Sequence, residues 1–173
     1  MTTTTTDAVT IPTTGEYRID PARSTIEFAT RHMFGLGPVR GTFRLRAGHI
    51  RVADRLDESA VRAVVAAESF HTGSSTRDTQ VTSAAYLDAA AYPDITYEST
   101  ELALTEEGWQ LCGTLTVRGR GAPVAVRILS LTPAARGFRL RARARVDRYA
   151  FGITAGRGIT GRRLTVTFDM LAR

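Results

Sequence analysis

This 173-residue sequence contains no lysine, a single cysteine and no long apolar run. Because Cys112 is its only thiol, the chain cannot form an internal disulfide. The first residues, MTTTTTD, lack the basic start and the apolar core of a secretory signal peptide. No stretch approaches the ~20 continuous apolar residues that a membrane-spanning helix needs. We therefore expect a cytoplasmic protein without a transmembrane segment.

Apolar residues and arginines alternate strictly from Phe138 to Val146. A helix would scatter these arginines around its circumference, whereas a strand places all of them on one face. A strand with one apolar face is typical of an antiparallel sheet that has one side in water. Because most segments of the chain share this alternation, the sheet has to cover its apolar face with itself. A sandwich or a closed barrel does so, and a barrel encloses a lumen.

Eight segments alternate in this way and are predicted strands. They are residues 26–32, 39–46, 61–68, 95–100, 109–118, 124–128, 138–146 and 163–170. Short turn sequences, for example at residues 106–108 and 119–121, separate several of them and indicate hairpins in an up-and-down order. The sequence therefore predicts an all-β fold with eight antiparallel strands.

One segment does not alternate and is predicted to be helical. Ser75, as N-cap, and Asp78 have the spacing of a helix start, and Tyr92 ends the run because a residue before proline avoids the α region. We expect a short helical insertion at about residues 77–90. The Thr-rich residues 1–14 are expected to form a disordered tail, which leaves residues 15–173 as one domain.

Eight short motifs then occur in a characteristic order. They are YRIDPARSTIEF (17–28), HMFG (32–35), VRGTF (39–43), TRD (76–78), SAAYLD (83–88), YPDITYEST (92–100), GTLTVRG (113–119) and DRYAFG (147–152). This series resembles the YceI-like family of polyisoprenoid-binding proteins over about residues 16–171. The resemblance implies a lipocalin-like barrel with an elongated apolar pocket, long isoprenoid ligands such as polyprenyl phosphates or quinones, and frequent homodimerisation. Thr79-Gln80-Val81 departs from the acidic-His-Leu sequence usual in the family, so contacts of that histidine do not carry over.

The apolar faces of the predicted strands supply the residues of the predicted lumen. These are Phe28, Phe43, Val65, Tyr97, Trp109, Leu111, Leu115, Val126, Ile128, Leu140, Ala142, Ala144, Val166 and Phe168. Small residues on the same faces, such as Gly113, leave room for a slender ligand, although larger residues opposite them can fill that space. Each buried CH₂ group is worth roughly 0.8 kcal/mol, so such a lumen selects length and width more than chemical detail.

Five polar residues are candidates for the mouth of the barrel and for contact with a lipid head group. They are His32, Arg77, Asp78, Asp147 and Arg148. Arginine suits phosphate because its forked donors are always charged. The favoured interpretation is nevertheless structural, with ion pairs of Arg77 with Asp147, or of Asp78 with Arg148, that tie the helix to the barrel rim.

Other motifs lack the context that their functions need. Residues 156–161 match G-x-G-x-x-G, but a strand and not a helix follows them, so we expect no dinucleotide site. The three histidines have no metal-ligand spacing, and no nucleophile-elbow sequence is present. We therefore expect no metal, no cofactor and no catalysis.

The arginines of residues 138–146 and the formal net charge of +6 bear on the partners of the protein. A solvated outer wall is the favoured interpretation of the arginine row, followed by a dimer or membrane-headgroup surface. Nucleic acid is not an expected partner, because no exposed aromatic residues are interleaved with the arginines.

The sequence thus predicts a non-enzymatic protein that binds, sequesters or carries an isoprenoid or related long-chain lipid in a barrel lumen. Transient membrane contact is compatible with this function, and a homodimer is expected. One alternative is a stress-response or interaction module whose barrel is filled and binds no lipid. A second is a small-molecule enzyme on the same barrel, for which the inward faces hold almost no acid or base groups.

Overall fold

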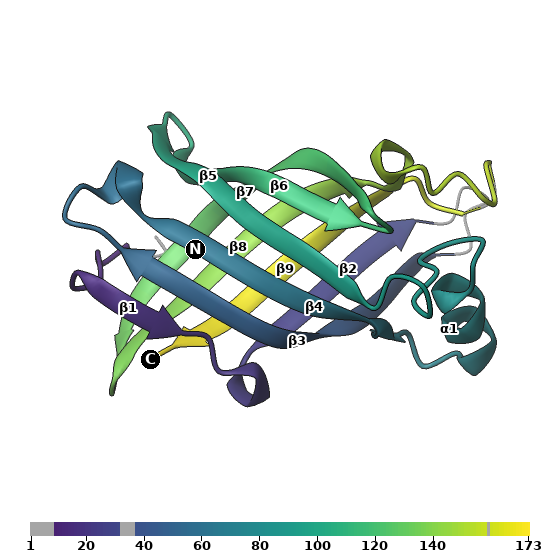
Figure 1. Ribbon diagram of the computed structural model, residues 1–173, viewed down its shortest axis with the longest axis horizontal. Coiled ribbons are helices and arrows are strands. Elements are labelled where there is room, and N and C mark those ends of the chain that lie inside the picture. The colour runs from purple at the N-terminus through teal and green to yellow at the C-terminus, as the bar shows by residue number, and fades with distance from the viewer. Residues whose placement is uncertain (1–8, 32–36, 159) are drawn as a thin grey trace, which may run out of the picture.

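The computed structural model describes residues 9–31, 37–158 and 160–173. Its strands are β1 (Gly15–Arg18), β2 (Thr25–Arg31), β3 (Pro38–Val52), β4 (Ala60–His71), β5 (Asp94–Thr105), β6 (Gly108–Val117), β7 (Arg120–Ala134), β8 (Gly137–Asp147) and β9 (Arg163–Ala172). Its helices are α1 (Ser75–Thr82) and the 3-10 segments η1 (Pro21–Arg23), η2 (Leu56–Glu58) and η3 (Arg148–Phe151). Figure 1 shows the strands wrapped around a common axis, with α1 at one end.

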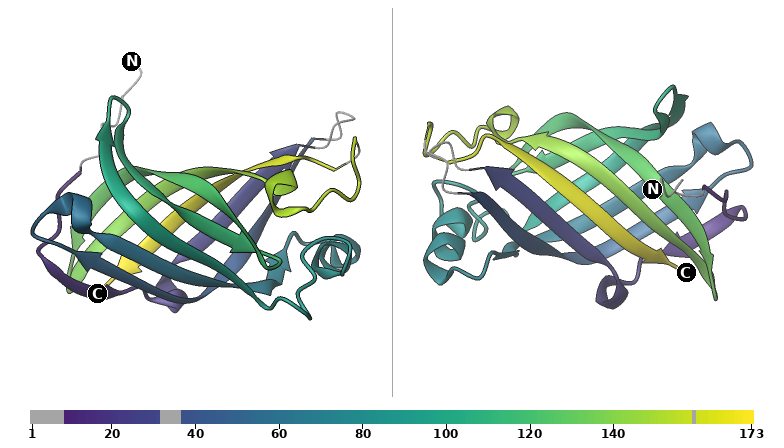
Figure 2. Two further views of the ribbon diagram at one scale, coloured as in Figure 1. Left: turned by 45° about the horizontal axis from the view of Figure 1, so that its top comes forward. Right: turned by 180° about the vertical axis from the view of Figure 1, so that it is seen from behind.

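The strands form one antiparallel sheet in the order β1-β3-β2-β9-β8-β7-β6-β5-β4. A further pairing of β3 with β4 closes the sheet, so that β2 to β9 make a ring of eight strands (Figures 1 and 2). The predicted eight-stranded antiparallel, lipocalin-like barrel is therefore confirmed. The sequence did not reveal β1, a four-residue strand too short to show a period, which pairs with the end of β3.

The alternation of the sequence matches the burial of the strands. In β8, Ala142 and Ala144 are buried, whereas Arg141 and Arg143, which alternate with them, are exposed. Where the pattern breaks, the backbone has an extra residue: β5 carries an irregularity between Ser99 and Glu101. Such a bulge bends the strand and changes the face towards which the following side chains of β5 point.

The helix differs from its prediction at both ends. α1 ends at Thr82, well before residue 90, and its N-cap is Ser74, whose hydroxyl accepts a hydrogen bond from the backbone N–H of Arg77 (3.3 Å). Residues 83–92 form successive turns, and Asp88 has a φ of 49°, a left-handed conformation that a helix does not contain. The predicted helix at 77–90 was therefore too long.

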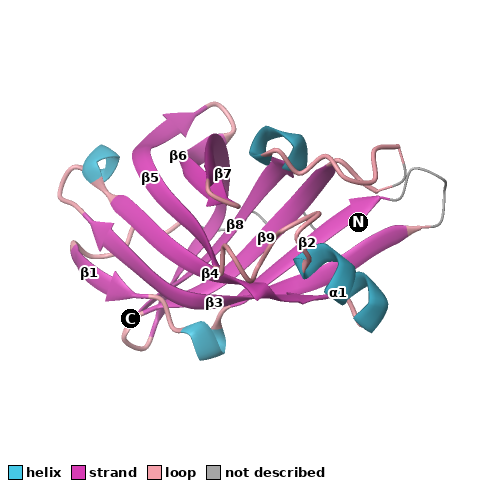
Figure 3. Ribbon diagram, turned by 45° about the vertical axis from the view of Figure 1, so that its right-hand side comes forward, coloured by secondary structure: helices cyan, strands magenta, loops and turns pink. Residues whose placement is uncertain are grey.

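The connections between strands gather at two ends of the barrel (Figure 3). We call the end with α1, η3 and residues 152–158 and 160–162 the mouth end, and the end with β1, η1 and η2 the far end. Residues 9–14 of the expected tail run beside β7, where Val9 bridges Leu131 and the Thr10 N–H donates to the Leu131 carbonyl (2.8 Å). In the described ranges, no helix has the length and apolar character needed to cross a bilayer.

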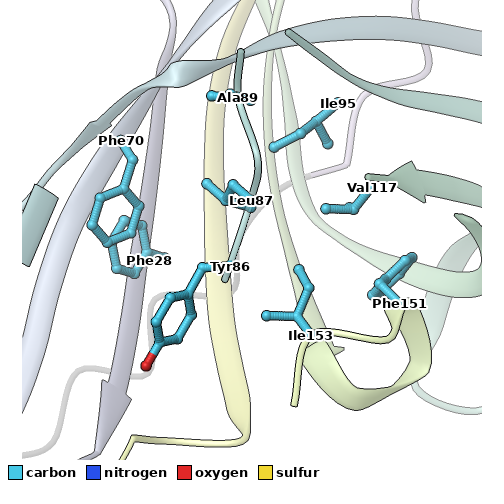
Figure 4. Close-up of a cluster of buried hydrophobic side chains, with 10 residues drawn as sticks. Phe28, Phe70, Tyr86, Leu87, Ala89, Ile95, Val117, Phe151 and Ile153 are labelled. Carbon is cyan, nitrogen blue, oxygen red and sulfur yellow. The ribbon is translucent and has the colours of Figure 1, made fainter. Parts of the chain in front are cut away.

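The interior packs as three clusters of buried side chains. The mouth cluster combines barrel residues such as Phe28, Phe70 and Ile95 with residues of the mouth connections, including Tyr86 and Ile153 (Figure 4). The Phe28 and Phe70 rings stack with centroids 5.0 Å apart. The far cluster contains Ile19, Ile26, Leu45, Ile50, Val52, Phe138, Met170 and Ala172. The third cluster contains Leu111, Val126, Ala142 and Ala144.

Candidate functional site

A cavity of about 370 Å³ lies at the mouth end, between the barrel wall and the connections that cover it. We call it the mouth cavity. Phe28, Phe43 and Phe70 form an apolar wall from three strands, and α1 contributes Arg77 and Val81. The cavity has the size of a small-molecule site, for which about 300–1,000 Å³ is usual.

A second, smaller cavity of about 80 Å³ lies towards the far end, and we call it the far cavity. Six of the predicted lumen residues line it: Trp109, Leu111, Val126, Ile128, Leu140 and Ala142. Ile11 and Pro12 from the segment before β1 also contribute, and Ser59 is the one polar residue among the described residues of its lining. This cavity can therefore hold only an apolar group.

Between the two cavities, side chains of the barrel wall pack against one another, and most of them are half-buried. Six predicted lumen residues line neither cavity: Val65, Tyr97, Leu115, Ala144, Val166 and Phe168. They pack in or against the buried clusters instead. A Cβ at Gly113 would lie 2.7 Å from the Tyr97 ring, so the space that this glycine leaves is occupied by Tyr97. Among the described residues, the predicted lumen residues thus contribute to two separate cavities, whereas the resemblance to the YceI-like family implied one elongated pocket.

Tyr97 is anchored at this position by its hydroxyl group. The hydroxyl shares its proton between the carbonyl oxygens of Val124 (3.2 Å) and Leu111 (3.3 Å). Burial, and secondarily the charge of Cys112, raises the pKa of Tyr97 to about 12. The phenol therefore stays protonated and acts as a donor in the barrel wall.

Arg148 is one of two arginines that line the mouth cavity, and it is buried at 7% exposure. Its guanidinium donates to the carbonyl oxygens of Gly161 (Nε, 2.9 Å), Ile153 (Nη1, 2.9 Å), Ala155 (Nη1, 2.7 Å) and Thr160 (Nη2, 3.2 Å). Four of its five N–H groups thus hold the backbone at these four residues in place. The positive charge has no carboxylate within 4.0 Å among the described residues.

The two predicted rim ion pairs do not form. Asp147 pairs with Arg162 (Nη2 to Oδ2, 2.8 Å) and accepts a hydrogen bond from the Tyr149 N–H at the start of η3. The hydrogen-bonded Arg162 is the main reason that the pKa of Asp147 lies below its usual value. The prediction of Arg77 with Asp147, or Asp78 with Arg148, was wrong because both carboxylates find nearer partners.

Asp78 instead ties α1 to the end of β4. One carboxylate oxygen accepts hydrogen bonds from the Thr72 backbone N–H (3.0 Å) and hydroxyl (2.7 Å), and the other lies 3.3 Å from His71 Nδ1. Asp78 therefore positions the helix and does not line the cavity.

Arg77 is the second arginine of the mouth cavity and is half-buried. Its Nη1 donates to the Thr72 hydroxyl at 3.3 Å, which leaves most of its donors for other partners. Among the described residues that line the cavity there is no acidic side chain, so Arg77 and Arg148 make the site electropositive. His32, the fifth predicted mouth residue, lies outside the described residues.

Sequence reasoning missed the part of the site that comes from turns. Tyr86, Leu87 and Ile153 line the mouth cavity, and the Tyr86 hydroxyl lies 3.3 Å from the Thr160 hydroxyl. Turn residues have no period of two that would mark their inward side. The only signal was that Tyr86 and Leu87 belong to the SAAYLD motif.

Comparison with known proteins places these features in a family. The model of the YceI-like domain matches residues 17–172. The UPF0312 proteins of Yersinia pestis and Yersinia enterocolitica are 29% identical over 114 residues, which cover 64% of this chain. The match spans 59% of the length of these relatives, which is less than two thirds.

Solved structures share the fold. BcnA of Burkholderia cenocepacia superposes with a TM-score of 0.77 at 19% identity, covering 88% of this chain and 98% of BcnA. A polyisoprenoid binding domain from Saccharophagus degradans, implicated in plant cell wall breakdown, has a TM-score of 0.67 at 15% identity, with 91% and 97% covered. The YceI protein of Campylobacter jejuni has a TM-score of 0.58 at 17% identity, with 80% and 86% covered. The chain, with its closed eight-stranded ring and a family match over nearly all its length, belongs to the YceI-like domain family.

Proposed function

We propose that this protein binds a long-chain lipid of the isoprenoid type, with the polar head at the mouth end and the chain directed into the barrel. The observation that carries the proposal is the mouth cavity, an apolar space of about 370 Å³ with two arginines in its wall. The structural likeness to a polyisoprenoid binding domain supports the same class of ligand. The protein would sequester or carry this lipid.

The energy of such binding comes from the chain of the ligand. An isoprene unit of five carbons contributes on the order of 3–4 kcal/mol of burial energy, at roughly 0.8 kcal/mol per carbon. Two or three buried units would offset part of the cost of fixing the ligand, which is about 4–15 kcal/mol. The side chains that pack between the two cavities limit the depth of entry unless they change rotamer.

The head group is expected to be anionic or strongly hydrogen-bond accepting. Arg148 supplies a positive charge but has little donor capacity left, because four carbonyl oxygens occupy it. Arg77 has free donors and lines the same cavity, so it is the proposed contact of the head group. This assignment favours a phosphate over a neutral quinone as the ligand.

We also propose that the protein has no catalytic activity. The titratable side chains among the described residues of the mouth cavity are Arg77, Arg148 and Tyr86. None of them provides a carboxylate or imidazole that would serve as a general base near neutral pH. The expected cytoplasmic location and the homodimer remain predictions, to be checked by cell fractionation and by light scattering.

The side chains that pack between the two cavities favour a second candidate function. An interaction module with a filled barrel would need no tunnel, and the six lumen residues that line neither cavity are compatible with such a module. It would bind a protein partner on its outer surface and take up no lipid. The two candidates therefore differ in whether the mouth cavity is used.

A cavity-filling substitution separates these candidates. Val81→Trp places an indole ring in the mouth cavity from α1, and we expect it to lower uptake of a polyprenyl phosphate at least tenfold. Leu104→Trp is the matched control, because Leu104 is 67% exposed on the β5–β6 hairpin and borders neither cavity. Uptake is measured by native mass spectrometry. Equal uptake by the two variants would contradict the proposed site.

A further inference from the structure

Four arginines line an open hollow on the outer wall beside the barrel mouth, which we call the arginine hollow. They are Arg31 at the end of β2, Arg40 in β3, Arg162 just before β9 and Arg163 at the start of β9. The hollow has no acidic side chain among its described lining residues. Thr30 and Gly161 line both the hollow and the mouth cavity, so the two sites are neighbours.

The charges of the hollow are largely unneutralised. Arg31, Arg40 and Arg163 are exposed, and none has a carboxylate within 4.0 Å in the part of the chain that the structure describes. Asp147 is an acid beside the hollow: it holds Arg162 and lies opposite Arg163 in the β8–β9 pair, and both arginines lower its pKa. Four arginines beside this carboxylate leave an excess of positive charge, and a bound anion would relieve the repulsion among them.

The hollow lies at the positive end of a polarised molecule. The described connections at the mouth end contain more basic than acidic residues. The arginines are Arg77, Arg118, Arg148, Arg157 and Arg162, and the acids are Asp78 and Asp88. The described connections at the far end contain more acidic than basic residues. The acids are Asp20, Asp54, Asp57, Glu58, Glu106 and Glu107, and the arginines are Arg23, Arg55, Arg136 and Arg173. The two ends lie at opposite sides of the barrel (Figures 1 and 3). This polarity would turn the mouth towards an anionic surface.

We infer that the arginine hollow is a docking site for the phosphate groups of an anionic membrane, and that docking holds the barrel mouth against the bilayer. The forked donors of arginine match phosphate oxygens. The hollow has no aromatic side chain in its described lining on which bases would stack, so a membrane fits it better than a nucleic acid. The purpose of docking, access to the carried lipid, rests on the proposed function, while docking itself is measured without that lipid.

Vesicle flotation tests the inference on the full chain. We expect the protein to bind vesicles made of equal parts of phosphatidylcholine and phosphatidylglycerol, and not vesicles of phosphatidylcholine alone. Binding should weaken as salt is added, because salt screens exposed charges. Each arginine near an anionic membrane contributes about a fivefold gain in partitioning.

Two double variants, each of which removes two positive charges, test whether the arginine hollow is the surface that binds the membrane. Arg31→Gln with Arg163→Gln removes two charges of the hollow and should lower partitioning at least tenfold. Arg23→Gln with Arg136→Gln removes two exposed charges at the far end, which have no acidic partner within 4.0 Å among described residues, and should leave partitioning within twofold. Circular dichroism and denaturant unfolding check that both variants are folded.

Several results would overturn the inference. Equal losses in the two double variants would mean attraction by net charge alone. Displacement from vesicles by inorganic phosphate, beyond the effect of chloride at equal ionic strength, would identify a site for soluble phosphates. Binding of single-stranded RNA in preference to vesicles would identify a nucleic-acid surface. Failure to dock with lipid uptake intact would reject this inference alone, whereas docking without uptake would reject the proposed function alone.

Discussion

At the scale of single residues, Arg148 shows how a charge becomes part of the architecture of a site. Its guanidinium donates to the carbonyl oxygens of Ile153, Ala155, Thr160 and Gly161, which lie outside the described helices and strands. Nothing in the sequence marked this role, since the partners are backbone atoms and carry no side-chain signature. The sequence identified Arg148 as a mouth residue but assigned it the wrong partner.

Replacing Arg148 by methionine should therefore destabilise the protein by about 3 kcal/mol, because several buried carbonyl oxygens lose their donor. Arg157→Met is the control: Arg157 is exposed, contacts the Tyr149 ring at 5.2 Å, and should change stability by at most about 0.5 kcal/mol. Denaturant unfolding measures both values. If the two variants lost equal stability, the carbonyl cluster would not be held by Arg148.

Tyr97 gives a prediction for alkaline pH. Its pKa is about 12 in the folded protein, against 10.0 for an unperturbed tyrosine. The unfolded chain therefore releases this proton first, so the free energy of unfolding should fall as pH rises from about 10 towards 12. Below pH 10 the contribution of Tyr97 is fully present. Unfolding of Tyr97→Phe measured over the same range should fall less steeply, and parallel curves would contradict the assignment.

At the scale of elements, the strands were predictable and the connections were not. The period of two located the strands of the ring because each has a buried and an exposed face along most of its length. β1 and the end of α1 were missed for a different reason. β1 is only four residues long, and residues 83–92 are turns whose conformation depends on contacts with the barrel and not on local propensity.

Helix α1 depends on its first turn more than on its own length. With eight residues it is too short to be stable alone, and its N-cap is the hydroxyl of Ser74. Ser74→Ala should cost about 1 kcal/mol of stability. Ser75→Ala, one residue later, removes a hydroxyl that caps nothing and should cost less than about 0.5 kcal/mol. Thermal unfolding distinguishes this from the predicted cap at Ser75, for which the order of the two variants would be reversed.

At the scale of the whole molecule, the barrel has the mouth cavity at one end and the far cavity towards the other. Alternation predicted a sandwich or a closed barrel, because a sheet with one apolar face must cover it, and the resemblance to the YceI-like family selected the barrel. The separation of the two cavities was not predictable, because it depends on which large side chain reaches over which small one, as Tyr97 does over Gly113. The sequence had left both outcomes open.

The most direct test of the central claim is native mass spectrometry of the purified full chain, before and after addition of a polyprenyl phosphate. We expect one lipid per barrel, either retained from the cell or taken up, with its chain shielded from water. Organic extraction of the retained species would give its mass and class. A mass equal to that of the polypeptide alone, unchanged by polyprenyl phosphate, quinone or fatty acid, would contradict lipid binding and favour the filled interaction module.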